Sequence, residues 1–89
     1  MIYSISVRVI HPDWLESMGG VFCEHTYSYE FTTAVGLRII VSPLSDSMKD
    51  WHVSFFHGKD TLSIPNHFQY QDQLLMVFEL FGYRQGVAN

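Results

Sequence analysis

The sequence has few charged residues and a single cysteine. Charged residues make up only 16% of the 89 residues, against about 25% in an average soluble domain. Cys23 alone forms no internal disulfide and no multi-cysteine zinc site. Five basic residues against nine acidic ones, a formal charge of −4, leave no basic stripe for a nucleic-acid backbone. We therefore expect a reduced protein that binds no nucleic acid directly.

Long apolar runs are also missing. No stretch approaches the roughly 18 apolar residues that a membrane-spanning helix needs. The first ten residues lack the basic and apolar regions of a signal peptide. These absences predict a cytoplasmic protein with no membrane partner.

Aromatic and aliphatic residues are plentiful instead. Hydrophobic residues make up 47% of the chain and aromatic residues 16%, which is enough for a core without metal or disulfide. The chain is too short for two independent cores and contains no repeat or linker, so we expect one domain over residues 1–89.

Strands are predicted from the alternation of apolar and polar residues. This period of two covers residues 2–10, 21–31 and 37–42, and two further runs at 51–57 and 61–64 read as a hairpin around a glycine-containing connection. The predicted fold class is α+β, with a four- or five-stranded antiparallel sheet, a C-terminal helix packed on one face and a short helical segment after the first strand.

The two helices are predicted from capping residues and from apolar spacing. Pro12 and Asp13 suit the start of a short helix, and Gly19-Gly20 its end. The C-terminal helix is predicted from about Asn66 to Phe81, with Asn66 or Asp72 as N-cap and Gly82 as the left-handed residue after its end. Its apolar stripe comprises Phe68, Leu74, Leu75, Phe78 and Phe81, widened by Met76, Val77 and Leu80.

The alternation sorts the strand residues onto two faces. We expect Ile5, Val7, Val9, Val21, Tyr27, Tyr29, Ile39, Val41, Val53, Phe55 and Ile64 in the core under the helix. The opposite face then carries Ser4, Ser6, Arg8, Phe22, Glu24, Thr26, Ser28, Glu30, Arg38, Ile40, His52, Ser54 and Phe56. Antiparallel sheets often leave one such face uncovered.

The uncovered face has two interpretations. It could be a solvated surface on which Arg8 and Arg38 pair with Glu24 and Glu30. Alternatively, its apolar residues form the centre of a binding surface with a polar rim. The predicted partner-binding residues are Phe22, Glu24, Thr26, Ser28, Glu30, Arg38, Ile40, His52, Ser54 and Phe56. Trp14 and the loop from Ser42 to Asp50 are the next candidates for an interface.

The histidines suggest other chemistry. His52-Val53-Ser54-Phe55 resembles the His-apolar-Ser-apolar strand found twice in two-histidine phosphoesterases, but the chain lacks a second strand in that pattern. Cys23 and His25 share one face at a spacing of two, as zinc ligands can, and His57 is the histidine that could join them. We interpret these residues as ordinary strand residues, and we expect no metal, no cofactor and no catalytic residue.

The composition and the two faces together favour a small acidic, non-enzymatic protein-binding module. Short chains of this kind include inhibitors and immunity-type proteins that block a larger protein partner, for example phage-encoded anti-defence inhibitors. Two alternatives stay open: a small metal-binding or hydrolytic enzyme that uses His25 or His52, and a homodimeric structural subunit.

Overall fold

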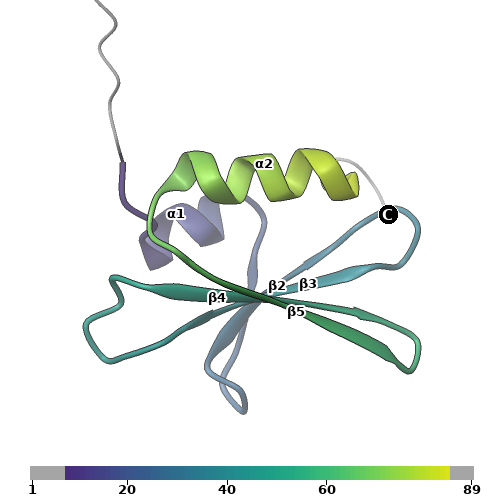
Figure 1. Cartoon of the computed structure of the whole chain (residues 1–89), viewed down its shortest axis with the longest axis horizontal. Coiled ribbons are helices and arrows are strands. Elements are labelled where there is room, and N and C mark those ends of the chain that lie inside the picture. The colour runs from purple at the N-terminus through teal and green to yellow at the C-terminus, as the bar shows by residue number, and fades with distance from the viewer. Residues whose placement is uncertain (1–7, 85–89) are drawn as a thin grey trace, which may run out of the picture.

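The computed structural model describes residues 8–84, and it places five strands and two helices there. In chain order the elements are α1 (Pro12–Ser17), β1 (Val21–Cys23), β2 (Ser28–Thr32), β3 (Arg38–Pro43), β4 (Trp51–His57), β5 (Asp60–Phe68) and α2 (Gln71–Phe81). The strands form one antiparallel sheet in the order β1-β2-β3-β4-β5, and both helices lie on the same side of it (Figure 1). This confirms the predicted fold class.

The core lies between the sheet and α2. Two cross-strand rows point toward the helices: Tyr29, Val41 and Val53 in one, and Phe31, Ile39 and Phe55 in the other. All six are buried, with at most 8% of any residue exposed. The ring of Phe78 lies 4.7 Å from that of Phe31. Burying each such side chain stabilises the fold by about 1.5–3 kcal/mol.

The C-terminal helix begins later than predicted. Residues 66–68 belong to β5, and Pro65 is tolerated there because β5 is an edge strand, where a missing N–H costs no ladder bond. The prediction of Asn66 or Asp72 as N-cap was wrong, because Tyr70 holds that position. The Gln73 side chain accepts hydrogen bonds from the backbone N–H groups of Gln69 (2.9 Å) and Tyr70 (3.0 Å).

The end of α2 is as predicted. Gly82 adopts the left-handed conformation with φ 79°, and the N–H of Tyr83 donates to the carbonyl of Phe78 at 2.8 Å. The ring of Tyr83 packs on that of Phe78, with centroids 4.9 Å apart. Its hydroxyl donates to the carbonyl of Met18 at 2.6 Å, so the end of α2 is joined to the end of α1.

The first helix is also where the sequence places it. Pro12 stands at its start, and the N–H of Asp13 donates to His11 Nδ1 at 3.1 Å. Leu15 points into the core and is fully buried. The chain then turns at Gly19, with φ 95°, into β1.

The prediction for the segment that precedes α1 was wrong for Val9, which lies within the described residues. Val9 was expected in the core but is 58% exposed, while Ile10 is 2% exposed. The reason is a short bridge between Val9 and Tyr70, with the N–H of Ile10 donating to the Gln69 carbonyl at 3.0 Å. The predicted strand residues 2–7, with Ser4, Ile5, Ser6 and Val7, lie outside the described residues.

A second error concerns the continuous strand predicted over residues 21–31. The structure has a hairpin there, in which Cys23 pairs with Ser28 around a turn over residues 24–27. Tyr27 takes the left-handed conformation, φ 52°, although the turn contains no glycine, proline, asparagine or aspartate. As a result, Val21 and Tyr27 are not in the core but 67% and 52% exposed.

Candidate functional site

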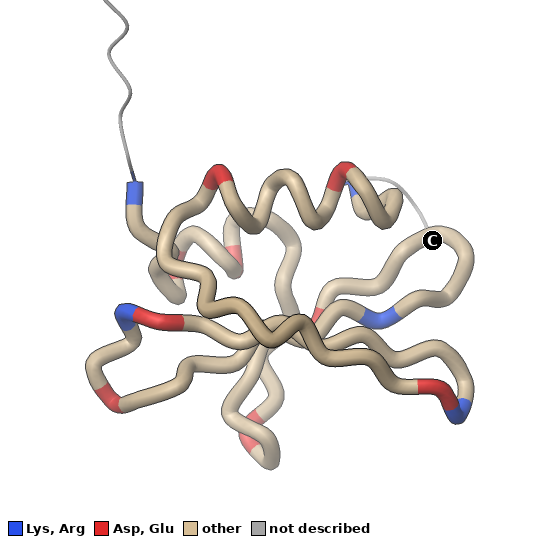
Figure 2. Tube along the Cα trace, viewed as in Figure 1, with Lys and Arg blue, Asp and Glu red and all other residues tan. Residues whose placement is uncertain are grey.

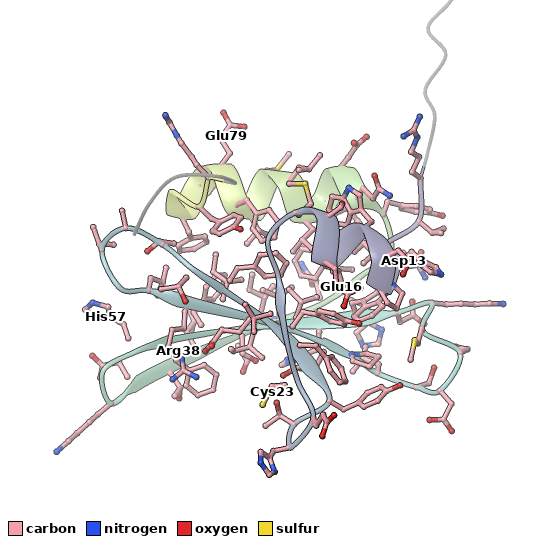
Figure 3. All side chains as sticks on the ribbon, turned by 180° about the vertical axis from the view of Figure 1, so that it is seen from behind. Asp13, Glu16, Cys23, Arg38, His57 and Glu79 are labelled. Atoms are coloured by element: carbon pink, nitrogen blue, oxygen red, sulfur yellow. The ribbon has the colours of Figure 1, made fainter. Side chains whose placement is uncertain are left out.

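The side of the sheet away from the helices is uncovered, and we call it the open face. It is formed by Val21, Cys23, Ser28, Glu30, Thr32, Arg38, Ile40, Ser42, His52, Ser54, Phe56, Thr61 and Ser63. Figure 3 shows the helices above the sheet and the labelled Cys23 below the point where the strands cross. The register defines the face, because Glu30 stands beside Ile40, Ile40 beside Ser54, and Arg38 beside Phe56.

A pocket of about 280 Å³ opens on this face. It is lined by six of the predicted partner-binding residues together with Cys23: Thr26, Ser28, Glu30, Arg38, Ile40 and Phe56. Ile40 and Phe56 are half-buried and provide its apolar part. The predicted residues His52 and Ser54 lie on the same face, with His52 Nδ1 3.3 Å from the Ser54 hydroxyl.

Two predicted residues do not belong to the open face. Phe22 pairs with Tyr29 and so lies on the helix side, where its ring is 5.2 Å from that of Tyr29 and 5.5 Å from that of Tyr27. Glu24 lies in the turn between β1 and β2 and is exposed. Both errors follow from the turn, because reading residues 21–31 as one strand assigned the residues of β1 to the wrong sides.

Charge on the open face is concentrated in one ion pair. Arg38 Nε donates to Glu30 Oε1, which confirms one predicted cross-strand pair. The Arg38 guanidinium also lies over the ring of Phe56, 5.9 Å from its centroid. Because the Arg38 side chain is 55% exposed, the ion pair stabilises the fold by about 1 kcal/mol at most. Its main effect is to hold the guanidinium beside the apolar part of the pocket.

Cys23 is the site residue that the sequence reading missed. The Thr26 side chain hydrogen-bonds to it and is the largest cause that holds the pKa of the thiol below its ordinary value. Hydrogen bonds from the backbone groups of Thr26 and His25 also lower this pKa, whereas burial and the negative charge of Glu30 raise it. The Thr26 hydroxyl is also 2.6 Å from that of Ser28, which is only 1% exposed. If the turn after Cys23 had been predicted from the sequence, the alternation would have placed Cys23 on the open face.

The histidines are spread over different parts of the molecule. His25 is exposed in the turn over residues 24–27 and is not the strand residue that the alternation predicted. His57 is exposed at the end of β4, and Figure 3 shows it far from Cys23. Among residues 8–84, no group of three or more histidine, cysteine, aspartate or glutamate side chains is arranged to hold a metal ion.

A second hollow, of about 510 Å³, lies at the start of α1. Val9, His11 and Tyr70 form one wall, and Met48 and Lys49 from the β3–β4 loop form another. This is the loop that the sequence offered as an alternative interface. Trp14, the other alternative, is partly buried against the core.

Comparisons with protein families, with curated proteins and with solved structures found no match for this chain. Neither of the helices in residues 8–84 has the length and apolar character that crossing a membrane requires.

Proposed function

We propose that this chain is a non-enzymatic protein-binding module, an inhibitor or immunity-type protein that blocks a larger protein partner through the open face. The observation that carries the proposal is the pocket on that face, in which Ile40 and Phe56 lie beside the Arg38–Glu30 ion pair. Apolar side chains enclosed by charged and hydroxyl groups are the common layout of a protein interface, with a desolvated centre and a polar rim.

The chemistry of the pocket indicates what the partner presents. An apolar side chain of the partner would fill the space between Ile40 and Phe56. Hydrogen-bonding groups around it would meet Ser54 and His52, which already lie within 3.3 Å of each other. The guanidinium of Arg38 is held by both Glu30 and Phe56, so little of its freedom would be lost on binding. A phage-encoded anti-defence inhibitor is one kind of protein that would work this way.

Alanine substitutions on the open face test the proposal. The partner is first captured from a lysate with the purified full chain and identified by mass spectrometry, and binding is then measured by calorimetry. Phe56→Ala should weaken binding by about 2 kcal/mol, which is roughly thirtyfold, because apolar centres contribute most of the affinity of an interface. Arg38→Gln should change mainly the association rate and its salt dependence.

Val35→Ala is the matched control. Val35 is 78% exposed in the turn between β2 and β3, away from the pocket, so its truncation should leave the affinity unchanged. If Phe56→Ala folds and binds like the parent, the open face is not the interface, and the hollow beside Met48 becomes the next surface to test.

A further inference from the structure

The two edges of the sheet differ in length. β1, at one edge, has three residues, whereas β5, at the other, has nine. Within residues 8–84, no segment pairs with the outer side of β5. Seven of its nine residues are exposed; Ile64 and Phe68 are the exceptions. A long exposed edge presents unpaired N–H and C=O groups that can add another strand.

The hairpin turn determines which backbone groups face outward. Gly58 and Lys59 connect β4 to β5, His57 pairs with Asp60, and Gly58 has φ 62°, as in a type II′ turn. The N–H of Asp60 then bonds back to His57. Because backbone groups alternate along a strand, the N–H and C=O groups of Leu62 and Ile64 also point toward β4. The N–H and C=O groups of Thr61 and Ser63 point away from β4, to the open edge of the sheet. Pro65 is the next outward position and has no N–H to offer.

An apolar surface borders this edge on the helix side. It consists of Leu62, 61% exposed, Leu80, 74%, and Phe81, 38%. Leu62 pairs with Phe55, whose ring lies 4.4 Å from that of Phe81, so strand and helix contribute to one surface. Phe78 faces β2 and Phe81 faces β4, and helical spacing carries Leu80 further round toward β5.

Charges are absent from the centre of this surface. Asp60, at the first position of β5 and next to Lys59 in the turn, is the one residue of this strand that is Asp, Glu, Lys or Arg, as the colours of Figure 2 show. The acidic residues of α2 are Asp72 and Glu79, and Figure 3 shows Glu79 on the side of the helix that faces away from the sheet. Two copies of the chain, each with a formal charge of −4, could therefore approach here without placing like charges in contact.

We propose that a second copy of this chain binds along β5, so that the two sheets join into one of ten strands, five from each copy. A two-fold axis normal to the sheet at Leu62 would place Thr61 opposite Ser63 of the second copy. Each of these pairs would exchange two backbone hydrogen bonds, and Leu62 would face its own equivalent at a position where side chains come closest. Both α2 helices would lie on the same side, with Leu80 of each helix directed toward the other copy.

The backbone groups on the outer side of β5 favour an axis at Leu62 over an axis at Ser63. An axis at Ser63 would place Thr61 opposite Pro65, which lacks the N–H that the Thr61 carbonyl needs. With the axis at Leu62, Pro65 faces the turn residue Lys59 and no hydrogen bond is lost. The surface is also self-complementary, as a two-fold interface must be, because apolar residues meet apolar residues.

Sedimentation of the full chain at a series of concentrations tests the proposal. The parent should dimerise as concentration rises. Leu80→Glu should raise the dissociation constant about tenfold or more, because it buries a charge at the interface. Ser63→Pro should do the same by removing an outward N–H that β4 does not use. Val35→Glu, the matched control on the exposed β2–β3 turn, should dimerise like the parent.

A cross-link tests the register. In a Cys23→Ser background, Leu62→Cys should form a disulfide between copies on oxidation, because the facing residues lie within disulfide reach. Ile64→Cys should not, because in this register it faces Asp60 of the second copy. A chain that stays monomeric, a dimer that Leu80→Glu and Ser63→Pro leave intact, or a link through Ile64→Cys instead of Leu62→Cys would overturn the proposal. A dimer lost only in Phe56→Ala would overturn it too, in favour of the open face.

Discussion

The two faces of the sheet are made from the same strands but are packed differently. On the helix side, Ile39, Val41 and Val53 are fully buried, and Phe55 is 4% exposed. On the open face, their immediate neighbours Ile40, Ser54 and Phe56 are only half-buried. A ring on the helix side therefore contributes to the folding energy of the domain, whereas a ring on the open face is available for a partner.

The largest effect should separate the two faces directly. Phe78→Ala should destabilise the fold by about 3–5 kcal/mol, the usual cost of truncating a buried aromatic residue, because Phe78 is 2% exposed and contacts both Phe31 and Tyr83. Phe56→Ala, the matched change on the open face, should cost only about 1 kcal/mol because its ring is half-buried. Urea unfolding of both variants measures the difference. Equal losses would mean that the open face is part of the core.

A smaller loss of folding stability is expected at Gly20, where the chain enters β1 beside the core. A Cβ on Gly20 would lie 2.7 Å from Phe31 Cζ and 2.8 Å from the Leu15 carbonyl oxygen. Gly20→Ala should therefore destabilise by about 1–3 kcal/mol, since a tightly packed core cannot absorb an added methyl group without strain. Urea unfolding again measures the change in free energy.

Gly36→Ala is the control for this steric effect. Gly36 has open space within 4 Å but φ 86°, so alanine there meets only backbone strain, worth about 1 kcal/mol. The double variant Gly20→Ala with Phe31→Leu should lose less stability than the sum of the two single changes. If Gly20→Ala costs no more than Gly36→Ala, the close approach to Phe31 does not limit packing.

The sequence predicted the faces of β3 and β4 because those strands alternate without interruption between clear turns. It also predicted the Arg38–Glu30 pair, since the alternation of β3 puts Arg38 on the open face and that of β2 puts Glu30 there. It failed where a turn has no turn-forming residue, as with Tyr27. Missing this turn shifts the alternation by one residue and moves every side chain of β1 to the opposite face, which is why Val21 and Phe22 were assigned to the wrong sides. The start of α2 was also missed, because apolar spacing alone does not distinguish the end of β5 from a first helical turn.

The smallest effect concerns the acidity of the thiol at the open-face pocket. Hydrogen bonds led by the Thr26 side chain favour the thiolate and lower the pKa of Cys23, so the proton leaves at lower pH in the folded protein than in the unfolded chain. The associated stability is present above the unfolded pKa and is lost as the pH falls through the folded pKa. Alkylation by iodoacetamide requires the thiolate, and its rate should therefore rise at lower pH in the native protein than in urea.

Two substitutions at Thr26 identify the source of this shift. Thr26→Val removes the hydroxyl and should move the midpoint of the alkylation rate toward that of the unfolded chain, whereas Thr26→Ser keeps the hydroxyl and should retain the native midpoint. Because Cys23 is the sole cysteine of the sequence, mass spectrometry of the whole protein reports its reaction without interference. The same midpoint in Thr26→Val and the parent would show that the Thr26 hydroxyl does not hold the thiolate. The β1–β2 turn would then not set the chemistry of this pocket.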